Sequence, residues 1–212
     1  MHDFAPVGMF STFANVLATN AKSRYATLGD LITAARAHPG TINVGTTTVG
    51  STNHLAATLF KAMLALDVVI IPYRTPGDLL TAAVRNDVDM IVQSYGALKT
   101  ALEDKQIRAL ATTTPTRAAY LPDVQSVAEA GVKGFDVVTW NGFFVPTKTP
   151  PDVIELLNRA TRAVLDDPEL GRRFLDLGLE PKPSTPQALG ALMTDEVTRW
   201  ARVIAEAGIE KQ

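Results

Sequence analysis

The sequence predicts an α/β fold with a parallel sheet. Between about residues 17 and 115, short apolar strands alternate with amphipathic helices that are long enough to connect parallel strands. Helix-start residues, glycines and prolines stand at the expected places between these segments. With 212 residues, 46% of them apolar, the chain can bury a substantial core.

Local signals along the chain mark the ends of the helices in this region. Thr27, with Asp30 three residues later, has the pattern of a helix N-cap, and "HPG" at 38–40 ends that helix. A second helix begins near Thr52, and Pro76 opens a third. The strands are expected at 41–45, 68–73, 88–92 and 107–112, and the helices at 28–37, 52–64, 76–84 and 97–103.

The remaining residues carry more helix than sheet. A loop with a short helix is expected at 121–131, and a long strand with turn residues in its middle at 135–146. Three helices follow, at 151–166, 168–177 and 186–207, the last stopped by Gly208. The only further strand is a short one near 4–10, which is too little sheet for that much helix to cover.

Composition excludes several classes of function. A net charge of −2 gives no reason to expect a nucleic-acid partner. The chain has no cysteine, which excludes disulfides and thiol catalysis. No apolar run approaches the ~18 residues that a membrane span needs, and the first ten residues lack the basic and apolar regions of a signal peptide.

A run of small hydroxyl residues and glycine lies between the strand at 41–45 and the helix that begins near Thr52. In open α/β sheets, ligands bind at this end of the strands, and the free amides of a helix N-terminus attract anions. The run "GTTTVG" lacks the lysine of a nucleotide-binding P-loop, which favours a carboxylate over a polyphosphate. The residues by themselves equally allow an ordinary turn capped by Ser51.

Other polar residues are weaker candidates. His54 has no partnered carboxylate at metal-binding spacing and is more typical of a structural histidine. Tyr73, Gln93 and Ser94 follow predicted parallel strands at the same edge as the hydroxyl run, although polar residues are also ordinary at strand ends. There is no G-x-S-x-G motif and no pairing of a nucleophile with a base, so an enzyme is not expected, and neither is a metal or cofactor.

The whole chain resembles the Bug-type (TctC-like) solute receptors of tripartite tricarboxylate transporters. The resemblance rests on segments in family order, among them "HPGTINVGTTTVGSTNHLAATLFKA", "LPDVQSVAEAGVKGFDVVTWNGFFVPTKTPPDVIELLNRA" and "EVTRWARVIAEAGIE". It implies a type II periplasmic-binding-protein-like fold, in which two α/β domains close over a ligand. By this resemblance the second domain, about 15–118, is complete, whereas the first domain is truncated to 1–14 and 119–212.

The resemblance also implies a function. A receptor of this kind binds a small organic acid or amide and delivers it to membrane transporter subunits, without catalysis or a cofactor. The resemblance implies a periplasmic location, although no signal peptide appears in this chain. The ligand-binding residues carried over or placed at the same edge are Thr46, Thr47, Thr48, Val49, Gly50, Ser51, Thr52, Asn53, Tyr73, Gln93 and Ser94.

The sequence departs from the family pattern in two residues of this site. Gln93 stands where relatives often have aspartate, so the ligand is expected to differ, and Thr48 replaces a frequent glycine, which narrows the loop. A second functional class stays open beside the receptor, namely a cytosolic small-molecule sensing or assembly module on the same fold.

The truncated first domain leads to an expectation about assembly. Its three helices carry apolar stripes that the family packs on strands absent here. Exposing about 1,000 Å² of apolar surface would cost ~25 kcal/mol, more than a domain's net stability. We therefore expect these apolar stripes to be covered. A second copy of the chain in a homo-oligomer, packing of the helices on each other, or a separate chain that supplies the missing residues would each cover them.

Overall fold

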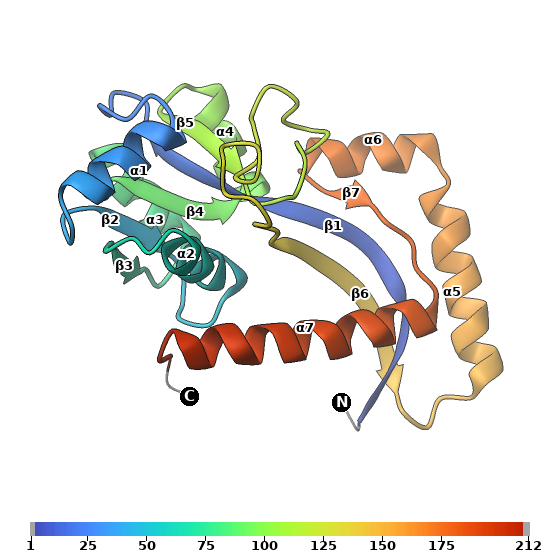
Figure 1. Cartoon of the computed structure of the whole chain (residues 1–212). Helices are drawn as coiled ribbons and strands as arrows, with labels where there is room; N and C mark the ends of the chain where they lie inside the picture. The colour runs from blue at the N-terminus through green and yellow to red at the C-terminus, as the bar shows by residue number, and fades with distance from the viewer. Residues whose placement is uncertain (1–2, 210–212) are drawn as a thin grey trace. The chain divides into compact units, whose positions relative to one another are not determined.

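The structure, a computed structural model, describes residues 3–209 (Figure 1). Contacts within the chain divide it into two compact units. The larger unit holds residues 14–138 and 203–209, and the smaller unit holds residues 3–13 and 139–202. Within the described residues, no helix combines the length and the apolar character that crossing a membrane requires.

A twisted sheet forms the centre of the larger unit. Its strands are β1 (Phe4–Asn20), β2 (Asn43–Thr46), β3 (Val69–Pro72), β4 (Met90–Ser94) and β5 (Ile107–Thr112), in the order β3-β2-β4-β1-β5. β2 is parallel to both of its neighbours, since Gly45 lies opposite Ile71 of β3 and Ile91 of β4. The predicted parallel pairing of the strands near 42–45, 68–72 and 89–92 is confirmed.

The strand expected near 107–111 does not pair in parallel, so this part of the predicted parallel sheet is wrong. β5 does not join the parallel strands directly, because β1 lies between β4 and β5 and is antiparallel to both. Leu17 of β1 lies opposite Val92 on one side and Ala111 on the other. β5 nevertheless runs in the same direction as β2, β3 and β4, as two successive antiparallel pairings require.

β1 is also longer than the strand expected near 4–10. It continues through residues 11–20, where Val16 and Leu17 point to opposite faces of the sheet and are both buried. A strand that is covered on both faces loses the alternation of apolar and polar residues by which a strand is recognised in a sequence.

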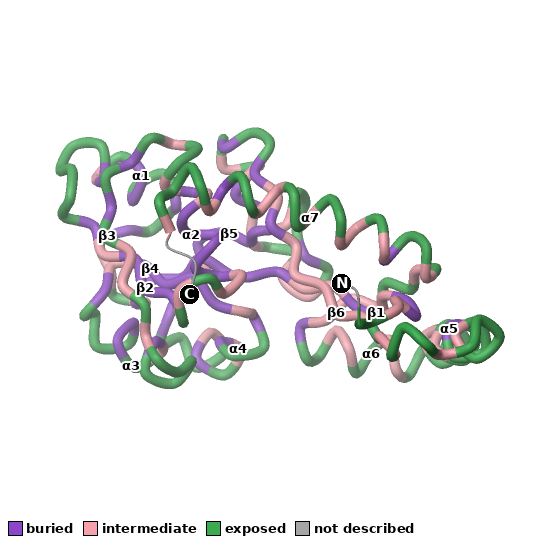
Figure 2. Tube along the Cα trace, turned by 90° about the horizontal axis from the view of Figure 1, so that it is seen from below, coloured by how far each residue is buried: buried purple, intermediate pink, exposed green. Residues whose placement is uncertain are grey.

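Four helices cover the sheet of the larger unit. They are α1 (Leu28–Ala37), α2 (Thr52–Met63), α3 (Pro76–Arg85) and α4 (Tyr95–Glu103), close to the predicted ranges. Thr27 and Asp30 form the expected capping box at α1, with Asp30 N donating to Thr27 Oγ1 over 3.1 Å and Thr27 N to Asp30 Oδ2 over 2.8 Å. Figure 2 shows α1 and α2 on one face of the strands and α3 and α4 on the other.

Residues 119–138 belong to the larger unit by their contacts, although they were expected to be part of the first domain. Val127 N donates to Thr112 O over 2.9 Å and Val137 N to Thr113 O over 2.8 Å, which ties this segment to the end of β5. The short helix predicted within 121–131 does not form, and the segment consists of turns. Residues 1, 2 and 210–212 of the predicted first domain lie outside the described residues.

The smaller unit combines strands with three helices. The start of β1 pairs with β6 (Val138–Pro146) and with β7 (Glu180–Pro181). β7 was not predicted from the sequence. The helices are α5 (Pro151–Leu165), α6 (Pro168–Asp176) and α7 (Pro186–Glu206). The turn residues expected in the middle of β6 do not interrupt it. A Cβ added to Gly142 would lie 2.8 Å from Leu189 Cδ2, so this glycine serves the close packing of α7 on the strand.

Much of the apolar surface of the smaller unit's helices stays exposed. Leu156 is 57% exposed, Val164 59% and Val197 59%, and the buried residue of α5 is the polar Asn158. α5 and α6 contact each other, yet these side chains stay exposed. The alternative that the helices cover their apolar side chains by packing on each other within one chain is therefore wrong. Between the helices and the strands lies an apolar groove of about 460 Å³, which includes the stacked rings of Phe10 and Phe143.

Candidate functional site

The connection from β2 to α2 is built around one left-handed glycine. β2 ends at the buried Thr46, and α2 begins at Thr52. Gly50 has φ +82°, a conformation that only glycine adopts without strain, and a Cβ added there would meet no atom within 4 Å. The loop therefore needs glycine for its backbone conformation, and open space lies next to it.

Two hydroxyl groups of this loop, those of Thr47 and Ser51, bond to one side-chain oxygen. Asn53 Oδ1 accepts from Thr47 Oγ1 over 2.8 Å, from Ser51 Oγ and from His54 N. Ser51 Oγ also accepts from His54 N and so caps α2. The prediction that Ser51 caps the helix is confirmed, and the hydroxyl hydrogens of Thr47 and Ser51 are engaged within the loop.

The backbone amides of the loop fall into two groups. Ser51 N donates to Thr48 O over 3.0 Å, and Gly50 N donates to His54 Nδ1 over 3.4 Å, so both close the turn. Thr52 and Asn53 are the first residues of α2, where helix geometry leaves the N–H groups without intrahelical acceptors. These two amides, with the positive end of the helix dipole, are the groups that can hold an anion.

His54 has a structural role in this arrangement. Its ring is largely buried, and this burial lowers the pKa of His54, which keeps the imidazole neutral near pH 7. A neutral ring leaves Nδ1 able to accept from Gly50 N, as the geometry requires. The structure thus favours the structural interpretation of His54 over that of a ligand or a base.

Tyr73, Gln93 and Ser94 lie at the same edge of the sheet as the loop. Tyr73 N donates to Thr46 O over 2.8 Å, so Tyr73 directly follows the end of β2 on the β3 side. Burial, and secondarily the charge of Asp87, raises the pKa of Tyr73, which keeps its hydroxyl protonated. Gln93 lies two residues beyond the pairing of Ile91 with β2, and Ser94 ends β4.

One residue at this edge was not identified from the sequence. Asn15 of β1 lies opposite Ser94 and is 3% exposed. It falls in the part of β1 that was not predicted to be a strand, and that is why no sequence pattern brought it to the sheet edge. The only possible signal was its polar side chain, which stands in a strand that pairs with neighbours on both sides.

The loop before α2 carries no charged side chain. The residues from Thr46 to His54 include no acidic or basic side chain apart from the neutral His54. Among residues 3–209, there is also no group of three side chains suited to hold a metal ion. The loop itself therefore offers neutral hydrogen-bond donors rather than a charged pair or a metal centre.

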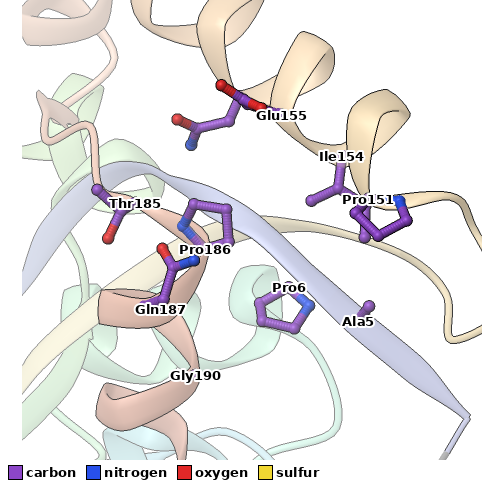
Figure 3. A pocket seen from close by; sticks show the side chains of 10 residues that line it. Ala5, Pro6, Pro151, Ile154, Glu155, Thr185, Pro186, Gln187 and Gly190 are labelled. Carbon is purple, nitrogen blue, oxygen red and sulfur yellow. The ribbon is translucent and has the colours of Figure 1, made fainter.

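A second pocket, of about 650 Å³, lies in the smaller unit and shares no residue with this edge (Figure 3). Pro6, Pro151 and Pro186 form part of its lining. Two of its polar residues have partners in the fold, since Asn158 Nδ2 donates to Val7 O and Ser184 O and Glu155 pairs with Arg159 over 2.8 Å.

Comparison with known proteins agrees with this architecture. The family model described as tripartite tricarboxylate transporter family receptor (TctC) matches residues 1–209. A relative from Pseudomonas sp. (strain P51), the UPF0065 protein in the tcbD-tcbE intergenic region, is 33% identical over 205 residues, which cover 96% of this chain and 61% of that protein. The chain thus spans about three fifths of the length of this relative.

Solved structures give the same result for the fold. R. palustris Rpa4515 with adipate superposes with a TM-score of 0.87 at 30% identity, over 97% of this chain and 69% of that one. Periplasmic binding protein BugD superposes with a TM-score of 0.83 at 26% identity, over 100% of this chain and 72% of that one. The predicted periplasmic-binding-protein-like α/β fold is confirmed, and the chain belongs to the tripartite tricarboxylate transporter receptor (TctC) family, the Bug-type receptors.

Proposed function

We propose that the chain is the solute-binding receptor of a tripartite tricarboxylate transporter and that it binds a small carboxylate at the edge formed by β2, β3 and β4. The observation that carries the proposal is the start of α2, where the amides of Thr52 and Asn53 lack intrahelical acceptors beside the open space at Gly50. Family membership supports it, as does a structural neighbour described with adipate.

The residues are assigned roles by their chemistry. The amides of Thr52 and Asn53 hold the carboxylate, while Thr46, Thr47, Thr48, Val49, Gly50 and Ser51 shape the loop around it. The protonated hydroxyl of Tyr73 and the amide of Gln93 contact the rest of the ligand, and Ser94 positions Gln93. Binding of this kind needs no metal, cofactor or catalytic group.

The wider role follows from family membership. We propose a periplasmic location and delivery of the ligand to membrane transporter subunits, with no nucleic-acid partner. Family membership favours this receptor role over a cytosolic sensing module. For the exposed apolar side chains of the smaller unit, we propose cover by further polypeptide, with a second copy of the chain as the simplest source.

A pair of variants at Thr52 tests the site. Thr52→Pro removes one N–H at the first position of α2, where proline is favoured, and Ser51, at φ −66° and ψ 159°, already has the conformation of a residue before proline. Thr52→Ala removes the side chain but keeps the N–H. Both variants should fold like the unaltered chain, as Pro76, Pro151 and Pro168 begin other helices.

The readout is calorimetric titration with a panel of adipate, succinate, malate and citrate. We expect the unaltered chain and Thr52→Ala to bind a member of the panel, and Thr52→Pro to bind it about tenfold or more weakly, as the loss of one hydrogen bond to a charged group implies. Equal affinity of the two variants would remove the α2 amide from the site. Failure of the unaltered chain to bind any member would remove the proposed function.

A further inference from the structure

The sheet of the smaller unit has a long edge with no strand beside it. The first part of β1 lies between β6 and β7, so among residues 3–209 the far edges of these two strands are unpaired (Figure 1). β7 has two residues, whereas β6 has nine. Every residue of β6 is partly or fully exposed, although Val7 and Ser11 of β1 are buried. The far edge of β6 therefore offers a long row of backbone groups to another strand.

β6 lacks the features that protect edge strands from pairing. Natural edge strands are short, or they carry charged side chains or proline. The other edge strands follow this rule, since β3 has four residues and ends at Pro72, β5 carries Arg108, and β7 consists of Glu180 and Pro181. β6, with the sequence VTWNGFFVP, has no charged residue, and its proline stands at its last position. Its edge is therefore suited to a partner strand.

Exposed apolar side chains are concentrated in the same unit. Of the eleven large apolar side chains that are exposed in the described part of the chain, eight belong to the smaller unit, namely Phe4, Phe143, Val153, Leu156, Leu157, Val164, Leu177 and Val197. Each of the eight is between 38% and 62% exposed, so that together they present roughly 400–500 Å² of apolar surface. A standard interface takes about 800 Å² from each partner, about 60% of it apolar. The unit thus exposes about the apolar area that one stable dimer interface needs.

Phe143 links the edge of β6 to the apolar groove of the smaller unit. Its ring is 50% exposed and stacks on Phe10, with the ring centroids 4.5 Å apart. Leu157, Val164 and Phe174 of the neighbouring helices also line this groove. A strand added to β6 would place every second side chain beside Phe143, where an apolar side chain would be covered by the groove.

We infer that the far edge of β6 pairs with β6 of a second copy of the chain, in antiparallel orientation. A strand that pairs in this way with its own copy creates a two-fold axis, so both copies use the same surface. The dimer is closed, because β1 already occupies the opposite edge of each β6. A register centred on Gly142 pairs the whole strand and sets Trp140 of each copy opposite Phe144 of the other, as a cross-strand aromatic pair.

This pairing gives the proposed cover by a second copy a definite surface, and it does not depend on the ligand. Hydrogen exchange of the unaltered chain tests it, at concentrations below and above the dissociation constant that sedimentation yields. In the dimer, residues 139–146 should exchange at least about tenfold more slowly than in the monomer, since the outward amides of β6 gain acceptors. The control is β3, an edge strand whose exchange should be the same at both concentrations.

A matched pair of lysine variants tests the same edge independently. Val145→Lys gives β6 the kind of charge that protects natural edge strands, and the two-fold axis brings two such charges into the interface. It should raise the dissociation constant of the dimer about tenfold or more. Val69→Lys places the same charge on β3, at a position that is 44% exposed, and should leave this constant unchanged. Thermal unfolding at low concentration checks that both variants fold.

Several results would overturn the inference, and they differ from failure of the proposed function. A chain that stays monomeric at all concentrations would overturn it, and so would a dimer in which residues 139–146 exchange as fast as in the monomer. Equal dissociation constants of the two lysine variants would also count against β6. In each case the titration with the ligand panel is unaffected, so the receptor function stands. Conversely, failure to bind any member of the panel would leave the pairing of β6 intact.

Discussion

The left-handed glycine before α2 gives the sharpest test of the loop. Gly50→Val places a β-branched residue at φ +82°. Gly134→Val is a matched control in the same unit, because Gly134 has φ +81° and an added Cβ there also meets no atom within 4 Å. A residue other than glycine in this region costs about 1–3 kcal/mol, so both variants should lose similar stability.

The two variants should differ in their response to ligand. At a ligand concentration of 100 times Kd, binding stabilises the unaltered chain by about 2.7 kcal/mol. If relief of strain at Gly50 turns the neighbouring amides away and removes one hydrogen bond to the carboxylate, Kd rises about tenfold or more. The stabilisation at the same concentration then falls to about 1.4 kcal/mol or less.

Thermal unfolding with and without the bound member of the panel measures this difference. For a chain of this size, 1 kcal/mol corresponds to a Tm change of about 2–4 °C, so the ligand-induced rise should be about 5–11 °C in Gly134→Val and at most about 3–6 °C in Gly50→Val. Equal ligand-induced rises in the two variants would refute the assignment of this loop to the site.

Three further predictions concern pH, packing and assembly. Burial lowers the pKa of His54 in the folded chain, so the unfolded chain binds the proton more readily, and stability should fall as the pH drops below about 6.5. Thermal unfolding against pH should show a flatter dependence in His54→Gln. Gly142→Ala should cost about 1–3 kcal/mol by crowding α7, whereas Gly171→Ala, in open space within α6, should stabilise by about 0.5–1 kcal/mol in denaturant unfolding. Sedimentation at increasing concentration should show self-association that Leu156→Lys weakens, and a monomer at all concentrations would contradict cover by a second copy.

The sequence by itself determined the elements whose signals are local. Thr27 and Asp30 predicted the cap of α1, Ser51 predicted the cap of α2, and the alternation of strands and helices predicted the parallel pairing of β2, β3 and β4. Each of these signals lies within about a dozen residues, where helix periodicity and capping chemistry act. The position of Tyr73 at the proposed site also followed, because parallel strands bring their C-terminal ends to one edge.

Only the tertiary structure decided which distant segments pair. The insertion of β1 between β4 and β5 depends on contacts such as Leu17 with Ala111, which lie far apart in the chain, and strands covered on both faces carry no alternating pattern. The same pairing buries Asn15 at the edge of the site and leaves its donor without a partner. The hydroxyl groups of Thr47 and Ser51 were expected to face a ligand. They donate instead to Asn53 Oδ1, because the folded loop and not the residue type sets the partners of a side chain.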